Sequence, residues 1–103
     1  MTYRISKRCF RKIKSFYHNV AKKYKHTYSE ELMHNNIDEA IDSMYQIEHT
    51  LLRRQPTISD WNGFYMANTS KWYFAYTIED DVITIVDACH AQNMHNVNED
   101  DFQ

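Results

Sequence analysis

The amino-acid sequence predicts an α+β domain in which an antiparallel helical hairpin packs on a largely antiparallel sheet of three to four strands. In the first half of the chain, apolar residues recur at three- and four-residue steps across two long segments, as in amphipathic helices. In the second half, β-branched and aromatic residues fill short runs. With one Gly and one Pro in 103 residues there is little linker material, so we expect one domain over residues 1–96 and a polar C-terminal tail over residues 97–103.

The chain begins with a predicted strand at residues 2–6, where Tyr3 and Ile5 alternate with polar neighbours. Ser6 is then the expected N-cap of a first helix that reaches about residue 25. The apolar stripe of this helix consists of Phe10, Ile13, Tyr17, Val20, Ala21 and Tyr24. Its other face is strongly basic, so the helix is amphipathic, with one side for the core.

A second helix is predicted to follow, because Thr27 and Glu30 have the spacing of a capping box. Its apolar face carries Met33, Ile37, Ala40, Ile41, Met44, Ile47 and Leu51. Arg53 and Arg54 are expected in the last turn, where positive charge suits the helix dipole, and Pro56 is expected to end the helix. The short connection between the helices predicts an antiparallel hairpin.

Three further strands are predicted after the helices. Gly63 permits a turn before a short strand at residues 64–67. A β-hairpin then joins residues 71–78 to residues 82–89 through an acidic turn at residues 79–81. One face of its first strand carries Trp72, Phe74, Tyr76 and Ile78. Because its second strand is apolar on both faces, we expect that strand in the centre of the sheet.

Charge is distributed unevenly along the chain, although the net charge is only −2. Residues 1–25 carry a charge of +9 with no acidic residue, and residues 26–103 carry −11. This asymmetry predicts a basic docking surface for an acidic protein or a nucleic acid, or else a basic helix lying beside acidic parts of its own domain. The candidate binding residues are Arg8, Arg11, Lys12, Lys14, Lys22 and Lys23 in the first helix, together with Arg53, Arg54 and Trp61.

The sequence contains no recognisable metal or cofactor site. Its six histidines do not have ligand spacing, and no Cys pair supports them, so we expect neither a metal nor a cofactor. Cys9 and Cys89 are expected to be reduced thiols, as in cytoplasmic proteins. Neighbours on a strand point to opposite faces, so Cys89 and His90 are not expected to form a nucleophile–base pair. The absence of 18 consecutive apolar residues predicts no membrane span.

A second group of candidate residues lies near the predicted strand ends. It combines aromatic, basic and imidazole side chains: Trp61, Tyr65, Lys71, Tyr73, His90, Gln92 and His95. Such groups together could stack on a base and transfer a proton. Ordinary sheet aromatics beside a strand-end histidine would produce the same pattern without any chemistry. Both interpretations stay open on these residues alone.

The order of these elements resembles that of the RelE/ParE superfamily of bacterial toxin–antitoxin toxins. One segment, YRISKRCFRKIKSFYHNVAKKY, is similar to the family's opening strand and basic helix. Another, WNGFYMANTSKWYFAYTIEDDVITIVDACHAQN, is similar to its closing turn, acidic hairpin and terminal cluster. The resemblance covers about residues 3–95 and lies in element order and hairpin pattern. It implies a cytoplasmic bacterial protein that is neutralised by a cognate antitoxin.

The resemblance implies one of two activities. A ParE-like toxin would bind and poison DNA gyrase. A RelE-like toxin would be a ribosome-dependent mRNA interferase, here with His90 as general acid or base, Lys71 as phosphate clamp and Tyr73 as base-stacking platform. Tyr73, Gln92 and Asn93 stand where that branch often has Arg, and phosphodiester cleavage needs nearby positive charge. We therefore expect the ParE-like activity, with the interferase, or a non-toxic interaction domain decayed from the family, as alternatives.

The antitoxin is expected to contribute an extended or amphipathic segment. It would lie in the groove beside the helical hairpin or on a free sheet edge. An acidic segment would fit the basic first helix, so charge reversal at Lys22 and Lys23 is expected to weaken the complex, more so at low salt.

Overall fold

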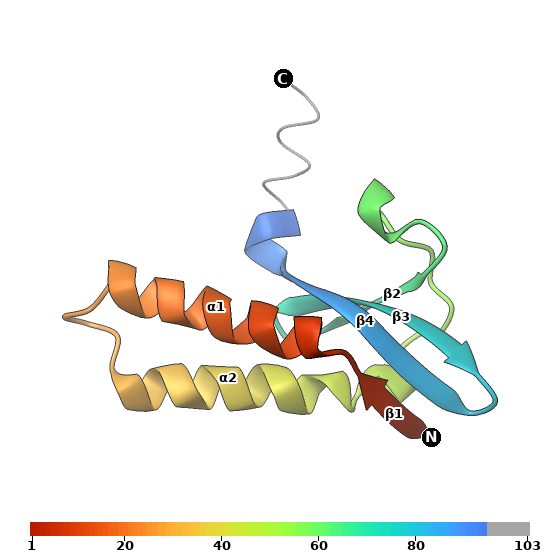
Figure 1. The fold of residues 1–103 in the computed structure, drawn as a ribbon, viewed down its shortest axis with the longest axis horizontal. Coiled ribbons are helices and arrows are strands. Elements are labelled where there is room, and N and C mark those ends of the chain that lie inside the picture. The colour runs from red at the N-terminus through yellow and green to blue at the C-terminus, as the bar shows by residue number, and fades with distance from the viewer. Residues whose placement is uncertain (95–103) are drawn as a thin grey trace.

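The structure, a computed structural model, describes residues 1–94 and has the α+β architecture that the sequence predicts (Figure 1). Two helices, α1 (Lys7–Lys23) and α2 (Glu30–Met44), pack on a sheet in which the strand order is β1-β4-β3-β2. The strands are β1 (Thr2–Ile5), β2 (Tyr65–Thr69), β3 (Trp72–Glu79) and β4 (Val82–His90). β1 runs parallel to β4, whereas the β4–β3 and β3–β2 pairs are antiparallel. β4 lies inside the sheet, as its two apolar faces predict.

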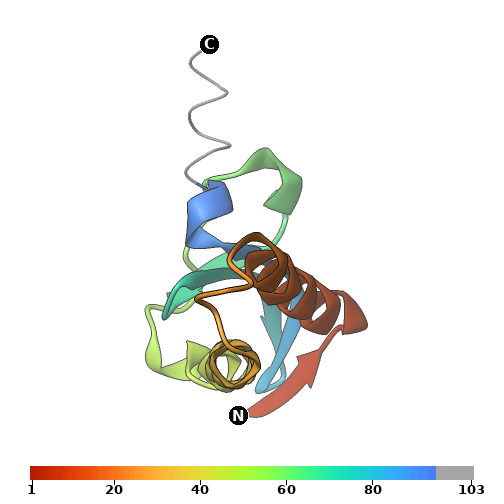
Figure 2. The ribbon, with the colours of Figure 1, turned by 90° about the vertical axis from the view of Figure 1, so that its left-hand side faces the viewer.

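Both helices cover the same face of the sheet. Residues of α1 and α2 share one core with Trp72, Phe74 and Tyr76, which confirms the predicted inner face of β3. Figure 2 looks along the helices and shows them side by side. α1 begins as predicted, because the N–H of Cys9 donates to the Ser6 hydroxyl over 3.3 Å. The helical hairpin therefore has its predicted partners, and its basic residues are left outside.

The second helix differs from the prediction at both ends. Its N-cap is Ser29, whose hydroxyl accepts from the N–H of Leu32 over 3.1 Å, and the hydroxyl of Thr27 donates to the Tyr24 carbonyl instead. α2 ends at Met44, well before Pro56. A 3-10 turn (Ile47–His49) follows it. Ile47, in this turn, still packs into the main core. The helical spacing of apolar residues therefore extends beyond the end of α2 itself.

Contacts with the sheet explain why α2 stops early. The Tyr3 hydroxyl of β1 donates to the carbonyl of Tyr45 and accepts from the N–H of Glu48, each over 3.0 Å. Further on, Arg53 has a φ of 61° and its N–H donates to the Tyr76 hydroxyl over 2.9 Å. The Arg54 carbonyl accepts from β2. Arg53 and Arg54 therefore lie in a connecting segment, and their predicted place in the last helical turn is wrong.

Leu51 does not belong to the apolar face predicted for α2. Its side chain follows the 3-10 turn and is 79% exposed. Because α2 has already ended, the helical period no longer decides which way this side chain points. The predicted burial of Leu51 is therefore wrong.

The three later strands follow the prediction closely. Gly63 has a φ of 93° in the turn before β2, and β2 extends two residues past its predicted end to Thr69. Asp80 and Asp81 both have positive φ, at 51° and 65°, as the central residues of a two-residue type I′ turn require. Between Ile85 and Asp87, β4 carries one extra residue, Val86, so the ladder with β3 contains a bulge.

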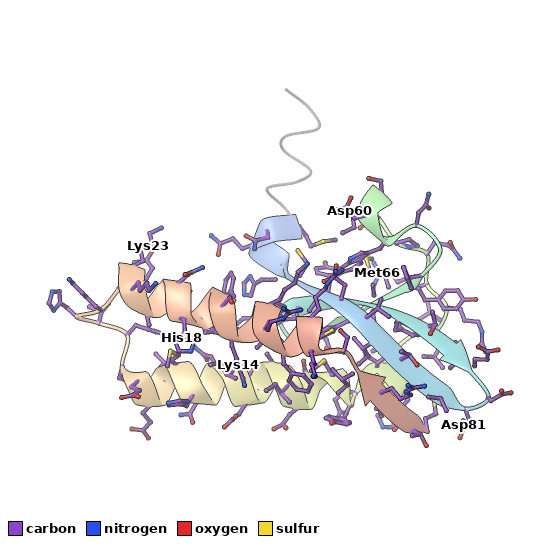
Figure 3. The ribbon with its side chains drawn as sticks, in the orientation of Figure 1. Lys14, His18, Lys23, Asp60, Met66 and Asp81 are labelled. Carbon is purple, nitrogen blue, oxygen red and sulfur yellow. The ribbon has the colours of Figure 1, made fainter. Side chains whose placement is uncertain are left out.

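The face of the sheet away from the helices carries a second, smaller core. It contains Trp61, Met66, Ala75 and Met94, with Tyr73 and Cys89 at its margin. Figure 3 shows Met66 inside this side of the molecule and Lys23 outside, at the far end of α1. No helix in residues 1–94 is long and apolar enough to cross a membrane. The predicted tail, residues 97–103, lies outside the described residues.

Candidate functional site

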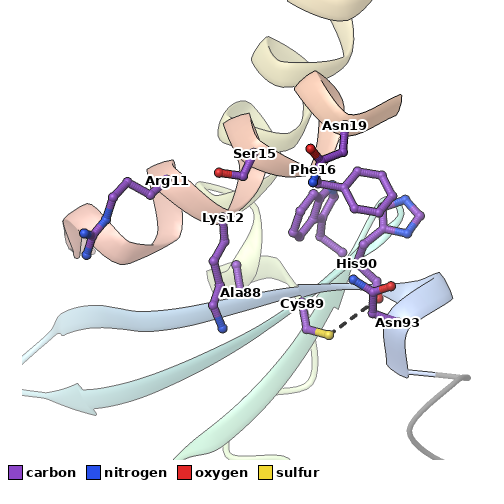
Figure 4. A pocket seen from close by; sticks show the side chains of 10 residues that line it. Arg11, Lys12, Ser15, Phe16, Asn19, Ala88, Cys89, His90 and Asn93 are labelled. Carbon is purple, nitrogen blue, oxygen red and sulfur yellow. Dashed lines mark hydrogen bonds between the residues drawn. The ribbon is translucent and has the colours of Figure 1, made fainter. Parts of the chain in front are cut away.

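A groove of about 340 Å³ opens between α1 and the end of β4 (Figure 4). It exists because β1 ends at Ile5, opposite Ile85, so within residues 1–94 no strand continues beside the last residues of β4. The wall from α1 carries Arg11, Lys12, Ser15, Phe16 and Asn19. The floor carries Ala88, Cys89 and His90. The groove thus combines a basic, polar wall with an imidazole at its far end.

His90 is packed into the helix–sheet interface at this end of the groove. Its ring stacks on Phe16, with centroids 4.1 Å apart and planes at 14°, and meets Trp72 edge-on at 5.3 Å. Burial lowers the pKa of His90 below its ordinary 6.5, and the nearby positive charge of Lys71 lowers it further. The ring is therefore neutral at physiological pH.

One tautomer of the His90 ring fits its contacts. Nδ1 accepts a hydrogen bond from the N–H of Gln92 over 3.1 Å. An accepting Nδ1 carries no hydrogen, so the hydrogen of the neutral ring sits on Nε2. The group that His90 can offer to a ligand is accordingly an Nε2–H donor rather than a base at that nitrogen.

An ion pair beside the groove joins Lys12 of α1 to Asp87 of β4. The Lys12 ammonium lies 2.7 Å from Oδ1 of Asp87, and the Trp61 indole N–H donates to Oδ2 over 3.0 Å. Burial alone would raise the pKa of Asp87, but the hydrogen bonds from Lys12, Trp61 and the Ala88 N–H outweigh it and hold that pKa below its usual value. The positive charge of Lys12 is thus largely balanced by the Asp87 carboxylate.

The structure brings two of the three predicted reaction groups near each other. Lys71 is close enough to His90 to lower its pKa. Tyr73 pairs with Cys89 and packs into the second core, on the sheet face opposite His90. Cys89 also lies in that core, so the expectation that Cys89 and His90 point to opposite faces is confirmed. Tyr73 cannot stack on a base held at His90.

The candidate binding residues are spread over several surfaces. Arg11 and Lys12 line the groove, and Lys23 lines a neighbouring hollow of about 300 Å³ that shares Phe16 and Asn19 with it. Lys22 borders a third hollow, of about 490 Å³, between the helices near their connection.

The remaining candidates lie away from the groove or outside the described residues. Arg8 and Lys14 are exposed on α1, and Arg53 and Arg54 lie in the connecting segment. Trp61 is only 3% exposed and binds Asp87. Tyr65 of β2 packs against the Tyr76 ring of β3. Gln92 follows β4 and lines the neighbouring hollow, and His95 is outside residues 1–94.

Two residues of the site were missed by the sequence interpretation. Phe16 lies three residues after Ile13 and four before Val20, so the helical period could have included it. Asp87 is a lone acid at the end of a β-branched run, which is itself a signal for a partnered carboxylate. Its partners, Lys12 and Trp61, have no sequence signature because they come from distant elements.

Comparisons of the sequence with protein families and with curated proteins identify no relative of this chain. No protein-family model matches its sequence, and no curated protein is significantly similar to it. Within residues 1–94, no three His, Cys, Asp or Glu side chains gather as ligands for a metal ion. The groove and the fold themselves are therefore the basis for assigning a function to this chain.

Proposed function

We propose that the chain is the toxin of a type II toxin–antitoxin module that acts in the bacterial cytoplasm by binding a host target, ParE-like, with DNA gyrase as the target. A cognate antitoxin would neutralise it. The element order supports this assignment, since a strand, a helical hairpin and three antiparallel strands occur as the family resemblance implies. This support is an analogy at the level of the fold.

One observation favours binding over RNA cleavage. His90 and Tyr73, which would have to act on the same nucleotide, lie on opposite faces of the sheet. The imidazole is neutral and packed on Phe16, and Lys12, the α1 lysine that lines the groove, is engaged by Asp87. The transition state of phosphodiester cleavage is negatively charged and needs several positive side chains that are not already paired within the protein. Recognition of a protein partner has no such requirement.

The antitoxin would use the basic side of the helical hairpin. The hollow between the helices is lined by Lys22 and Lys25, by the apolar groups of Tyr28 and Met33, and by one acidic residue, Glu30. Basic rims with apolar floors fit amphipathic segments that carry acidic residues. Lys23 continues the positive surface toward the groove.

Expression in a bacterial host provides the first test. Induced wild-type protein is expected to arrest growth, co-expression of the small gene adjacent to its own gene is expected to restore it, and purified protein is expected to inhibit gyrase supercoiling. Absence of arrest would leave the non-toxic interaction domain as the better description.

A His90→Phe variant separates the two toxin activities. Phenylalanine keeps the stack on Phe16 but removes every proton that the imidazole could transfer. Binding activity is expected to survive, so growth arrest and supercoiling inhibition should persist in this variant. Ribosome-dependent mRNA cleavage that is present in the wild type and lost in His90→Phe would establish the interferase instead. Phe16→Ala serves as the matched control for loss of packing.

Antitoxin binding is tested by charge reversal. Lys22→Glu combined with Lys23→Glu is expected to weaken the complex, and to do so more strongly at low salt, because exposed charges are screened by ions. Lys14→Glu makes the same kind of charge change on another exposed part of α1 and is expected to have a smaller effect. Equal losses for both would show that only net charge matters.

A further inference from the structure

The groove and the neighbouring hollow together form one trough along α1. Phe16, Asn19 and Asn93 line both of them. Arg11 is the first residue of α1 that lines the trough, and Lys23 lies at its other end. The helix between Arg11 and Lys23 is about 18 Å long, at 1.5 Å per residue. An extended peptide covers this length with about five or six residues.

The trough carries positive charge. Among the described residues, no acidic side chain lines either hollow. The cations that line it are Arg11, Lys12 and Lys23, and of these only Lys12 has a carboxylate partner within residues 1–94. Charge complementarity therefore favours a ligand with one negative group facing each end of the trough.

The middle of the trough carries amides. Asn19 on α1 and Asn93 just after β4 are both exposed and come from the two sides of the groove (Figure 4). A carboxamide has both hydrogen-bond donors and an acceptor, as the backbone of a peptide has. These two amides can therefore bind the backbone of an extended chain whatever side chains it carries there.

A single-stranded nucleic acid fits these residues less well. Such a strand needs positive charge along its length and aromatic rings on which its bases stack. In the described part of the chain, the cations without a carboxylate partner lie only at the two ends. The Phe16 ring is already stacked on His90, and the Lys23 ammonium lies over the Tyr24 ring, 5.4 Å from its centroid. A protein segment is therefore the better match.

We propose that the trough binds an extended segment of another protein that carries two acidic side chains about five or six residues apart. These side chains pair with Arg11 and Lys23, and Asn19 and Asn93 hold the backbone between them. The trough shares no lining residue with the hollow between the helices, so it is a second docking surface, separate from the one proposed for the antitoxin. Binding here does not depend on whether the chain is a toxin.

Two synthetic peptides of equal composition test the spacing. Both have blocked ends and contain two glutamates among alanines and serines. The first has its glutamates at the ends of a seven-residue sequence, and the second has them side by side in the middle. Amide resonances of isotope-labelled full-length protein are expected to shift along the trough on titration with the first peptide. The second is expected to bind up to about fivefold more weakly, because it reaches only one of the two end cations.

Four variants test the residues. Arg11→Gln and Lys23→Gln are each expected to weaken binding of the first peptide by up to about fivefold, since each removes one exposed ion pair. Asn19→Ala is expected to weaken it by about fivefold through loss of the amide hydrogen bonds. Lys14→Gln is the matched control, because Lys14 is exposed on the same helix and lines neither hollow, and it is expected to leave the affinity unchanged. Circular dichroism checks that each variant is folded.

The proposal is overturned by any of four results. Equal affinity for the two peptides, or an equal loss in Lys14→Gln, would show that only net charge matters. Resonance shifts outside the trough, or no shifts, would show that the trough does not bind the peptide, and this result needs no variant. Tighter binding of single-stranded polyuridine than of the first peptide would assign the trough to nucleic acid.

Acidic residues late in the chain's own sequence are the remaining competitor. Glu99, Asp100 and Asp101 lie outside the described residues. Their joint replacement by Gln and Asn is expected to leave the affinity for the first peptide unchanged at physiological salt, where distant charges are screened. A gain of more than about fivefold, beyond what one exposed ion pair contributes, would mean that these residues compete for the trough. That result would overturn its assignment to another protein.

Discussion

The imidazole of His90 lies flat against the phenyl ring of Phe16, with the ring centroids 4.1 Å apart and the planes inclined by 14°. This contact joins the end of β4 to the middle of α1, and the Trp72 ring meets the imidazole edge-on. The last residue of the strand is therefore part of the packing between helix and sheet. Its position in the groove does not by itself make it a reacting group.

Phe16→Ala is expected to lower the free energy of unfolding by about 2 kcal/mol. Phe→Ala changes at fully buried core positions cost about 3–5 kcal/mol. Phe16 is only partly buried, so its replacement is expected to cost less than this range. Urea unfolding followed by circular dichroism measures the change. Leu51→Ala, at a side chain that is 79% exposed, should shift the same free energy by less than about 0.5 kcal/mol. Similar losses for both would mean that the His90 stack carries no special stability.

The stability of the fold is expected to fall as pH decreases below about 6.5. The pKa of His90 is lowered in the folded protein by burial and then by Lys71, so the unfolded chain binds its proton first. Stability from this residue is complete above the unfolded pKa and is lost as pH falls from there toward the folded pKa. NMR titration should place the His90 midpoint below 6.5. In His90→Phe, the unfolding free energy should lose this part of its pH dependence.

Asp87 contributes stability that is also lost as pH falls, but in a more acidic range than for His90. Burial raises its pKa, but the bonds from Lys12, Trp61 and Ala88 more than compensate, so the folded pKa lies below 3.8. The contribution is present above the unfolded pKa and disappears as pH falls through the folded one. Asp87→Asn should cost about 1.5–3 kcal/mol at neutral pH, the range for hydrogen bonds to charged groups. The difference from wild type should shrink in strong acid, and a constant difference would contradict this account.

Tyr17→Phe tests the one polar contact between α1 and β3 inside the main core. The indole N–H of Trp72, a side chain 2% exposed, donates to the Tyr17 hydroxyl over 3.1 Å. Without the hydroxyl, that N–H is left buried and unpaired, which costs about 1–3 kcal/mol. Thermal or urea unfolding measures the loss. Tyr45→Phe, at a ring that is 46% exposed, removes a hydroxyl at the surface and should be nearly neutral. Equal effects would contradict the buried bond.

Substitutions in the β3–β4 turn are expected to raise the stability of the fold. Asp80 and Asp81 adopt positive φ, which Asn and Gly tolerate better than most residues. Asp80→Asn with Asp81→Gly is expected to stabilise the fold by about 1 kcal/mol, since the type I′ turn then has its preferred residues. The opposite change, Asp80→Val, should destabilise, because a β-branched residue strongly disfavours positive φ. A destabilised Asn-Gly variant would show that the acidic side chains have another role.

The sequence alone determined the elements whose cause is local. The periods of three to four and of two residues identified both helices and the β3–β4 hairpin, and the two apolar faces of β4 identified it as an inner strand. Ser6 capped α1 as expected because capping depends on a neighbour three residues away. The inner face of β3 was equally predictable, because alternation along a strand leaves one choice once a face is apolar.

Only the tertiary structure decided what depends on residues distant in sequence. α2 stops at Met44 because Tyr3, from the first strand, binds the backbone that follows it, and no local pattern encodes that contact. Likewise, the groove follows from the early end of β1, and the Lys12–Asp87 pair forms because α1 crosses the open edge of β4. Local periodicity can specify an element and its buried face. Where the element ends, and which side chains meet across it, is set by the packing of the whole chain.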